Sequence, residues 1–173
     1  MTHPPRAGPM LLLLMLLSPL PAPAAGPTPM TVAQIVAADR WALAEGECEG
    51  HPLILRFRED FRAHPDVSAY PHLVRVVWHY APNAAGMPDR AASEQMNVFE
   101  DGLVAAVEPD RTAVLTAVVT HDGEREWLFY GTDVRAFARA LRAIPQGDVP
   151  IDITTERGPD WSTLHEVTLS GLA

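Results

Sequence analysis

Cationic side chains alternate along two segments of this sequence that fit β-strands, at positions 51–58 and 72–80. Successive side chains of a strand point to opposite faces, so the cations of each segment share one face. If the two strands lie in one sheet in compatible register, they form a cationic surface that binds an anion or an acidic peptide. Arginine suits this chemistry because it holds carboxylate or phosphate through two parallel hydrogen bonds. The candidate ligand-binding residues are Arg56, Arg58, Arg75 and His79.

A second interpretation of the same residues is a solvated surface. Acidic residues alternate on another segment that fits a strand, at Glu124 and Glu126. If these or other local acids lie beside the cations, each positive charge is neutralised within the protein and no ligand is needed. The choice between the two interpretations depends on strand register, which no pattern in the sequence determines.

Catalytic and metal-binding patterns are absent from the sequence. No HxxxH, HxH or CxxC spacing occurs, so we expect no metal site and no cofactor. The serines lie outside a GxSxG context, and Cys48, the single cysteine, has no helix start or basic residue nearby in sequence that would activate its thiol. We therefore identify no catalytic residues. The alternative is a hydrolase or metal-dependent enzyme whose site forms only in the folded chain, from His79, His121, Asp160 and His165.

The charge of the chain excludes some classes of partner. The sequence has 22 acidic residues against 13 basic ones, all of them arginine, and a formal net charge of −9. Nucleic-acid binding relies on neutralising phosphates, and docking on anionic lipid also needs basic residues, so we expect neither. A protein or a small anionic ligand remains as the partner.

Residues 1–25 have the layout of a secretory signal peptide. Arg6 supplies a positive charge, positions 10–17 form an unbroken apolar run, and Ala22-Pro23-Ala24 supplies small residues around a cleavage point. The apolar run is well below the ~18 residues that span a bilayer, which favours cleavage over a retained anchor. We expect an exported protein, periplasmic or secreted, with no stable membrane insertion after the leader is removed.

The remainder of the chain is predicted to form one domain. Residues 26–38 are a lead-in segment, and 39–173 are a single α+β domain. Hydrophobic periodicity predicts a strand hairpin followed by strand, helix, two strands, helix and strand. Their ranges in order are 41–48, 51–58, 72–80, 91–107, 112–121, 124–131, 133–144 and 149–155.

This order of elements predicts an architecture. After the first hairpin it reads β-α-β-β-α-β, which is the split βαβ pattern of ferredoxin-like folds. Right-handed crossovers place both helices on one face of an antiparallel sheet. We expect the N-terminal hairpin to extend that sheet, and a short helical turn to begin at Pro159.

The hairpin at 112–131 is apolar on both faces, although a half-buried strand should alternate. With a two-residue turn at Asp122-Gly123, Thr116 pairs with Phe129. The second apolar face needs a cover, and we expect it to come from the same chain, with self-association as the alternative. The candidate covers are the Trp161 segment, residues 32–38 and another subunit.

Several short motifs, taken in order and spacing, resemble a known bacterial family over positions 41–167. They are Asn83-Ala84-Ala85-Gly86-Met87-Pro88, Leu128-Phe129-Tyr130-Gly131-Thr132-Asp133, Phe137 with Leu141, and Gly158-Pro159-Asp160-Trp161. The family is domain of unknown function 695. The resemblance implies an α+β fold and no catalytic residues. Gly158 departs from the pattern, because an acidic residue is more usual there.

These observations predict an exported, non-enzymatic binding or interaction module. The leader, the resemblance over nearly the whole domain and the missing catalytic spacing all favour it. The enzyme described above is one alternative, and a purely structural component of the cell envelope is another.

Overall fold

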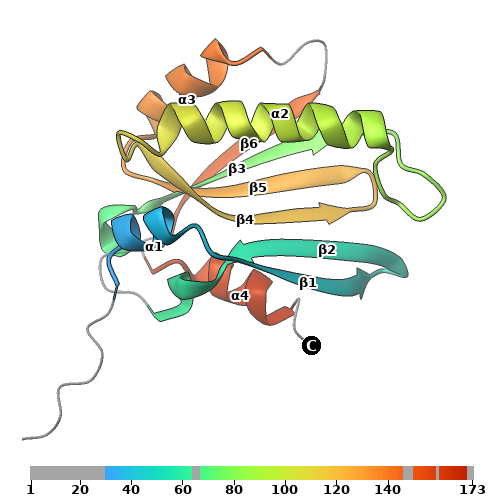
Figure 1. The fold of residues 1–173 in the computed structure, drawn as a ribbon, viewed down its shortest axis with the longest axis horizontal. Helices are drawn as coiled ribbons and strands as arrows, with labels where there is room; N and C mark the ends of the chain where they lie inside the picture. Colours follow the sequence, from blue (N-terminus) through green and yellow to red (C-terminus); the bar gives the residue numbers. More distant parts are fainter. Residues whose placement is uncertain (1–29, 64–66, 146–149, 159, 171–173) are drawn as a thin grey trace, which may run out of the picture.

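The computed structural model describes residues 30–63, 67–145, 150–158 and 160–170, and the predicted leader lies outside these ranges. Within them the fold is α+β, as expected from the sequence, with a six-stranded sheet and four α-helices (Figure 1). The elements are α1 (Val32–Ala38), β1 (Trp41–Cys48), β2 (His51–Arg58), the 3₁₀ turns η1 (Glu59–Ala63) and η2 (Val67–Ala69), β3 (His72–His79), α2 (Arg90–Val107), β4 (Ala113–His121), β5 (Glu124–Gly131), α3 (Val134–Ala143), β6 (Ile151–Arg157) and α4 (Ser162–Ser170).

All six strands form one antiparallel sheet in the order β1-β2-β4-β5-β3-β6. The N-terminal hairpin joins it through β2, whose Leu55 lies opposite Val119 of β4, so the hairpin extends the sheet as predicted. Strand β5 separates β3 from β4. Among the strands of the described ranges, β1 and β6 are therefore the two edges.

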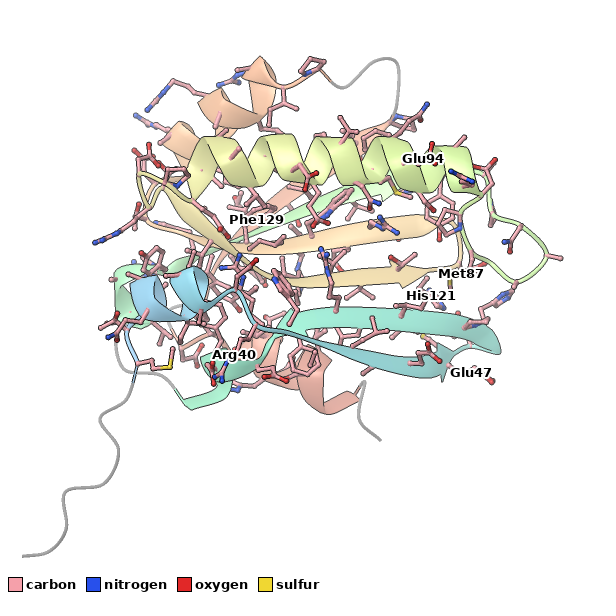
Figure 2. The ribbon with its side chains drawn as sticks, in the orientation of Figure 1. Arg40, Glu47, Met87, Glu94, His121 and Phe129 are labelled. Carbon is pink, nitrogen blue, oxygen red and sulfur yellow. The ribbon has the colours of Figure 1, made fainter. Side chains whose placement is uncertain are left out.

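Helices α2 and α3 pack on one face of the sheet (Figure 1). The predicted stripe of α2 is confirmed, because its apolar residues recur three and four apart and are at most 2 % exposed. They meet alternate residues of β3 and, from β5, Trp127 and Phe129, and Figure 2 shows Phe129 on the side of β5 that faces the helices. The residues of the α2 stripe are Met96, Phe99, Leu103 and Val107.

The opposite face of the sheet is covered by the two ends of the domain. Trp161 stacks on Tyr130 of β5, and its indole Nε1 donates to the backbone oxygen of Tyr70 at 3.1 Å. Val32 and Ile35 of α1 and Leu164 of α4 join the same buried cluster. The expectation that this chain covers its own second apolar face is therefore confirmed, with both candidate segments contributing.

The register of the β4–β5 hairpin corrects one prediction. Val118 lies opposite Trp127 as expected, but Leu115 rather than Thr116 lies opposite Phe129. A β-bulge at Thr116 causes the shift, because an extra residue on one strand moves the side chains on the far side of the bulge from the turn to the other face. The buried Thr116 hydroxyl donates to the backbone oxygen of Leu128 at 2.9 Å, which satisfies the polar group inside the sheet.

Two helices exceed what the sequence pattern predicted. Helix α1 forms inside the predicted lead-in segment and begins with a capping box, in which Thr31 and Gln34 bond each other's backbone N–H groups. Helix α4 extends to Ser170, well beyond a single turn. None of the helices in the described part of the chain has the length and apolar character that a membrane span requires.

The motif at 83–88 builds the turn that leads into α2. The side-chain oxygen of Asn83 accepts backbone N–H groups of that turn, and Gly86 adopts φ 78°, a conformation that favours glycine. The backbone oxygen of Gly86 accepts from the Tyr80 hydroxyl and from the N–H of Gly123, both at 3.0 Å. These bonds tie the start of α2 to the β4–β5 turn, so the motif has a structural role.

Candidate functional site

The structure does not bring the four predicted anion-binding residues together. Arg56 lies opposite Val118 and therefore on the face that α2 and α3 cover, as does Arg58 two residues later. Arg75 lies opposite Leu128, on the other face, and His79 follows it on that side. The sheet thus separates one pair of cations from the other.

Arg75 and His79 both lie beside acids of neighbouring strands. Arg75 pairs with Glu126 at 2.7 Å and lies 3.6 Å from Glu156. His79 lies between Glu124, 3.2 Å from its Nδ1, and Asp152, 2.9 Å from its Nε2. On this face the charge of Arg75 is neutralised by local acids, and the His79 ring lies between two carboxylates.

Arg58 is held in the interior by a charged partner. Its side chain is 4 % exposed and pairs with Glu108 at 3.1 Å. Glu108 also accepts the N–H of Leu115, while burial raises the pKa of its carboxyl above the usual value. The Arg58 guanidinium lies 4.8 Å from the ring centre of Trp41, and Arg56 lies 4.7 Å from the same ring. Arg58 therefore has a structural role, whereas Arg56 extends toward solvent.

The Arg56 side chain lines a cleft of about 160 Å³ between α2 and the outer strands β1, β2 and β4. Six strands about 4.8 Å apart span about 24 Å, which two helices about 10 Å wide do not cover completely, and this cleft lies in the uncovered part beside β1 and β2. Apolar residues form much of its wall, including Leu43, which is 64 % exposed. The lining residues are Leu43, Ile54, Arg56, Asn97, Glu100, Val118, Thr120 and Arg125.

Glu100 is the carboxylate of the cleft, and its oxygens have partners. One oxygen pairs with Arg56, and the other accepts the indole N–H of Trp127 at 2.8 Å. Glu100 projects from α2, Arg56 from β2 and Trp127 from β5. These bonds fix the position of the carboxylate, and its ion pair with Arg56 holds the guanidinium at the cleft.

Arg125 is the second cation of the cleft, and its bonds are to neutral groups. Its Nε donates to the Thr120 hydroxyl at 3.0 Å and its Nη1 to the Asn97 side-chain oxygen at 3.1 Å. Within the described ranges it makes no ion pair. Burial lowers the pKa of Arg125, while Glu100 acts in the opposite direction. The guanidinium remains charged near neutral pH, because arginine does not deprotonate in proteins.

The cleft therefore carries an excess of positive charge within an acidic protein. Two guanidinium groups face one carboxylate among its lining residues. A ligand with a carboxylate or phosphate group would balance the second cation, and the guanidinium donors suit such a group in geometry and charge. The apolar wall formed by Leu43, Ile54 and Val118 would contact the carbon part of the same ligand.

Arg125 was not among the ligand-binding residues predicted from the sequence, although the sequence indicates which face of the sheet its side chain occupies. It alternates with Trp127 along β5, and a buried tryptophan identifies the face that the helices cover. The contribution of Asn97 and Glu100 from α2 had no comparable signal, because it depends on how the helix is rotated over the sheet.

The four residues of the enzyme alternative do not come together at one place, although Asp160 and His165 lie close enough for their charges to interact. His79 lies with its two carboxylates on the face opposite α2 and α3, and the His121 Nε2 donates to the backbone oxygen of Cys48 at 3.0 Å. Figure 2 shows His121 at the end of the sheet where both hairpins turn. Asp160 and His165 belong to the α4 region, where Asp160 accepts the N–H of Ser162.

Metal-binding geometry is not found in the described part of the chain. No group of three or more histidine, cysteine, aspartate or glutamate side chains there is arranged to hold a metal ion. His79 and His121 both lie opposite Glu124 in register, but β5 separates their strands.

A larger cleft of about 330 Å³ lies beside α4, on the face opposite the Arg125 cleft. Leu53, Leu55 and Val119 form its apolar wall, and its polar rim is acidic. Glu126, the least exposed carboxylate of that rim, is already paired with Arg75. The charge of the Arg125 cleft is thus the stronger indication of a ligand.

Comparison with known proteins places the chain in a family without assigning an activity. No curated protein is significantly similar to it. A family model described as "family of unknown function (DUF695)" matches residues 39–168, which is most of the chain and the whole of the sheet. The resemblance seen in the sequence motifs is thereby confirmed, and the chain belongs to the DUF695 family of unknown function.

Proposed function

We propose that this protein is an exported, non-enzymatic binding module that holds a small anionic ligand in the cleft between α2 and the outer strands. The observation that carries the proposal is the Arg125 guanidinium, which lines the cleft and bonds to Thr120 and Asn97 without a paired acid in the described residues. Arg56 supplies the second cation, and Glu100 holds it in place.

The size and shape of the cleft limit the ligand. Clefts for drug-sized molecules measure about 300–1,000 Å³, so about 160 Å³ suits a much smaller ligand. A short carboxylate or a phosphate with a small organic group would fill it. The ligand's charged group would bond to the guanidinium groups, and its carbon atoms would contact Leu43 and Ile54.

For the fold, we propose that β3, α2, β4, β5, α3 and β6 form a ferredoxin-like split βαβ unit. The strand order β4-β5-β3-β6 and the position of both helices on one face support it. In this arrangement the β1–β2 hairpin is an addition beside β4. The cleft then lies where the addition meets the unit, because Arg56 comes from β2 and Arg125 from β5.

The ligand proposal is tested by titrating the purified domain with inorganic phosphate, acetate and succinate in a calorimeter at low salt. We expect at least one of these anions to bind saturably. Arg125→Gln should remove the binding, because the neutral amide cannot balance an anion. The matched control is Arg75→Gln, which removes an arginine whose side chain lies on the opposite face of the sheet.

Circular dichroism and thermal melting establish that both variants fold. No saturable binding of any of the three anions to the wild-type protein would contradict the proposal. Equal loss in both variants would also contradict it, since that result indicates a nonspecific response to total charge.

Export is tested separately by fractionating the source cells and sequencing the N-terminus of the mature protein. We expect a chain that begins after residue 25 and lies outside the cytoplasm. The layout of residues 1–25 supports this expectation. An intact chain starting at Met1 in the cytosol would contradict it, without affecting the anion titration.

A further inference from the structure

Strand β6 offers an open backbone edge. It pairs with β3 alone among the strands of the described ranges. The N–H of His79 donates to the backbone oxygen of Pro150 at 3.4 Å, so these two residues form a hydrogen-bonded pair. Hydrogen-bonded and non-bonded pairs alternate along an antiparallel ladder, so this pair shows which residues of β6 direct their backbone groups toward β3. By this alternation the backbone groups that point away from β3 belong to Ile151, Ile153, Thr155 and Arg157.

The same edge borders an apolar cleft of about 190 Å³ beneath α3. Ile153 and Thr155 line it from β6, because they lie opposite Val76 and Val74, on the face covered by the helices. Ile153 is 49 % exposed, although its neighbours Phe137 and Leu141 are almost fully buried. The cleft thus has an apolar floor that remains open along β6.

Helix α3 adds positive charge to the rim of this cleft. Arg135, Arg139 and Arg142 recur four and three residues apart and so form one stripe along the helix. Arg142 lines the cleft itself. None of these three arginines makes an ion pair within the described ranges, and the nearest acid in the helix sequence is Asp133, its N-cap.

From these observations we infer that β6 and α3 form a docking site for an extended acidic segment of another protein. The segment adds to the sheet as a further strand beside β6, using the outward backbone groups for affinity. One apolar side chain enters the cleft, and its carboxylates bond to the α3 arginines. Strand addition to a sheet edge, with pockets that read alternate side chains, is an established mode of peptide recognition. The site lies at the edge of the sheet opposite the β1–β2 hairpin, so it is independent of the Arg125 cleft.

The probe is a phage-displayed library of random heptapeptides, selected on the purified wild-type domain. We expect enrichment of peptides in which acidic and apolar residues occupy every second position, so that both kinds of side chain lie on the face covered by α3. An enriched peptide, synthesised with a fluorescent label, should shift the amide resonances of Ile153 and Thr155 more than those of Asp152 and Thr154 in a ¹⁵N spectrum. The difference is expected because the outward N–H groups would gain bonds to the peptide.

The decisive variant is Thr155→Pro, with Thr155→Ala as its matched control. Proline removes an N–H that points away from β3, which an edge strand tolerates, and so it blocks an added strand while β6 keeps its pairing. We expect the peptide to bind Thr155→Ala within about threefold of the wild type and Thr155→Pro at least about tenfold more weakly, since backbone bonds carry affinity in this mode.

A second variant tests the charge without altering the strand. The double substitution Arg139→Glu and Arg142→Glu lies on an exposed helix surface. It should weaken binding of the acidic peptide by at least about tenfold, because like charges then repel each other. Selection on this variant should enrich basic peptides instead.

Three results would overturn the proposal. The first is an enriched set without acidic residues, and the second is binding that neither variant weakens. The third is sedimentation data showing that the β6 edge is occupied by a second copy of this chain, with dimerisation lost in Thr155→Pro.

Discussion

Trp161 and Tyr130 stack face to face, with ring centres 4.2 Å apart and planes inclined by 17°. Tyr130 belongs to β5 in the middle of the sheet, and Trp161 immediately precedes α4. Both side chains are fully buried. This contact attaches the C-terminal helix to the second face of the sheet.

Removing the indole should therefore destabilise the domain strongly. Trp161→Ala is expected to lower the free energy of unfolding by about 3–5 kcal/mol, the cost of truncating a buried aromatic side chain. Trp161→Phe is the control, because it keeps an aromatic ring against Tyr130 while it loses the hydrogen bond to Tyr70 and the second ring of the indole. We expect its loss to be clearly smaller. Urea unfolding measures both, and equal losses would show that stacking is not the main contribution.

The buried pair of Arg58 and Glu108 makes a second prediction. Glu108→Gln keeps an oxygen for the N–H of Leu115 but leaves the Arg58 charge in the interior with only the more distant Asp39, 3.4 Å away. Breaking a buried pair in this way should cost about 3 kcal/mol at neutral pH.

The pH dependence of that cost checks its origin. Burial raises the pKa of Glu108 above its ordinary value of 4.5, so the folded protein protonates this group before the unfolded chain does. The wild type gains stability as it takes up this proton and the variant cannot, so the stability difference should widen as the pH falls through the raised pKa, measured by urea unfolding between pH 4 and 8. A difference that stays constant over this range would contradict the explanation.

Tyr130 predicts the behaviour of the domain in alkali. Burial raises the pKa of its phenol to about 12, against an ordinary value of 10.0. Between these values the unfolded chain loses the proton first, so the stability of the folded state must fall as the pH rises through this window. In Tyr130→Phe this part of the alkaline loss should disappear. Unfolding midpoints measured from pH 8 to 12 test this prediction. Burial also raises the pKa of Tyr80, so Tyr80 adds a loss of stability with rising pH that the Tyr130→Phe variant retains.

The first turn of α3 makes the opposite prediction for acid. The carboxylate of Asp133 accepts the N–H groups of Ala136 and Arg135, and these bonds lower the pKa of Asp133. Its contribution to stability is complete above the ordinary aspartate pKa and is lost as the pH falls through the lowered value.

Asp133→Ala should therefore lower the melting temperature at pH 7 and converge with the wild type in strong acid. Asp133→Asn retains an oxygen acceptor for the cap, and its melting temperature should lie between the two at neutral pH. A constant gap between Asp133→Ala and the wild type down to pH 2 would show that the carboxylate charge does not matter.

Local periodicity allowed much of the fold to be predicted. The alternation of apolar residues in β3 and their spacing of three and four in α2 identify the buried faces of these elements. Each pattern depends only on the face that one element buries, so it can be read from a short segment of sequence. The bulge at Thr116 could not be predicted, since nothing in the spacing around it distinguishes a continuous strand from one with an extra residue. Helix α1 did leave a signal, the Thr31–Gln34 capping box, in a segment where short length concealed it.

The candidate site was harder to predict than the fold. Arg56 and Arg75 each had a defined face within their own strands, but whether those faces coincide depends on the register between distant strands. Arg125 became significant only when Asn97 and Glu100 of α2 were placed above it. Sites formed between elements require relative positions that no single segment encodes.

Val32 and Leu164 lie in one buried cluster, although almost the whole domain separates them in sequence. A ribosome must therefore release nearly the entire chain before this cluster can close, and contacts between such distant residues also form slowly. Until then Leu55 and Leu128 lack the cover that Trp161 and Leu164 supply on that side of the sheet. A chaperone that binds exposed apolar strands would have the full duration of synthesis in which to capture the nascent chain.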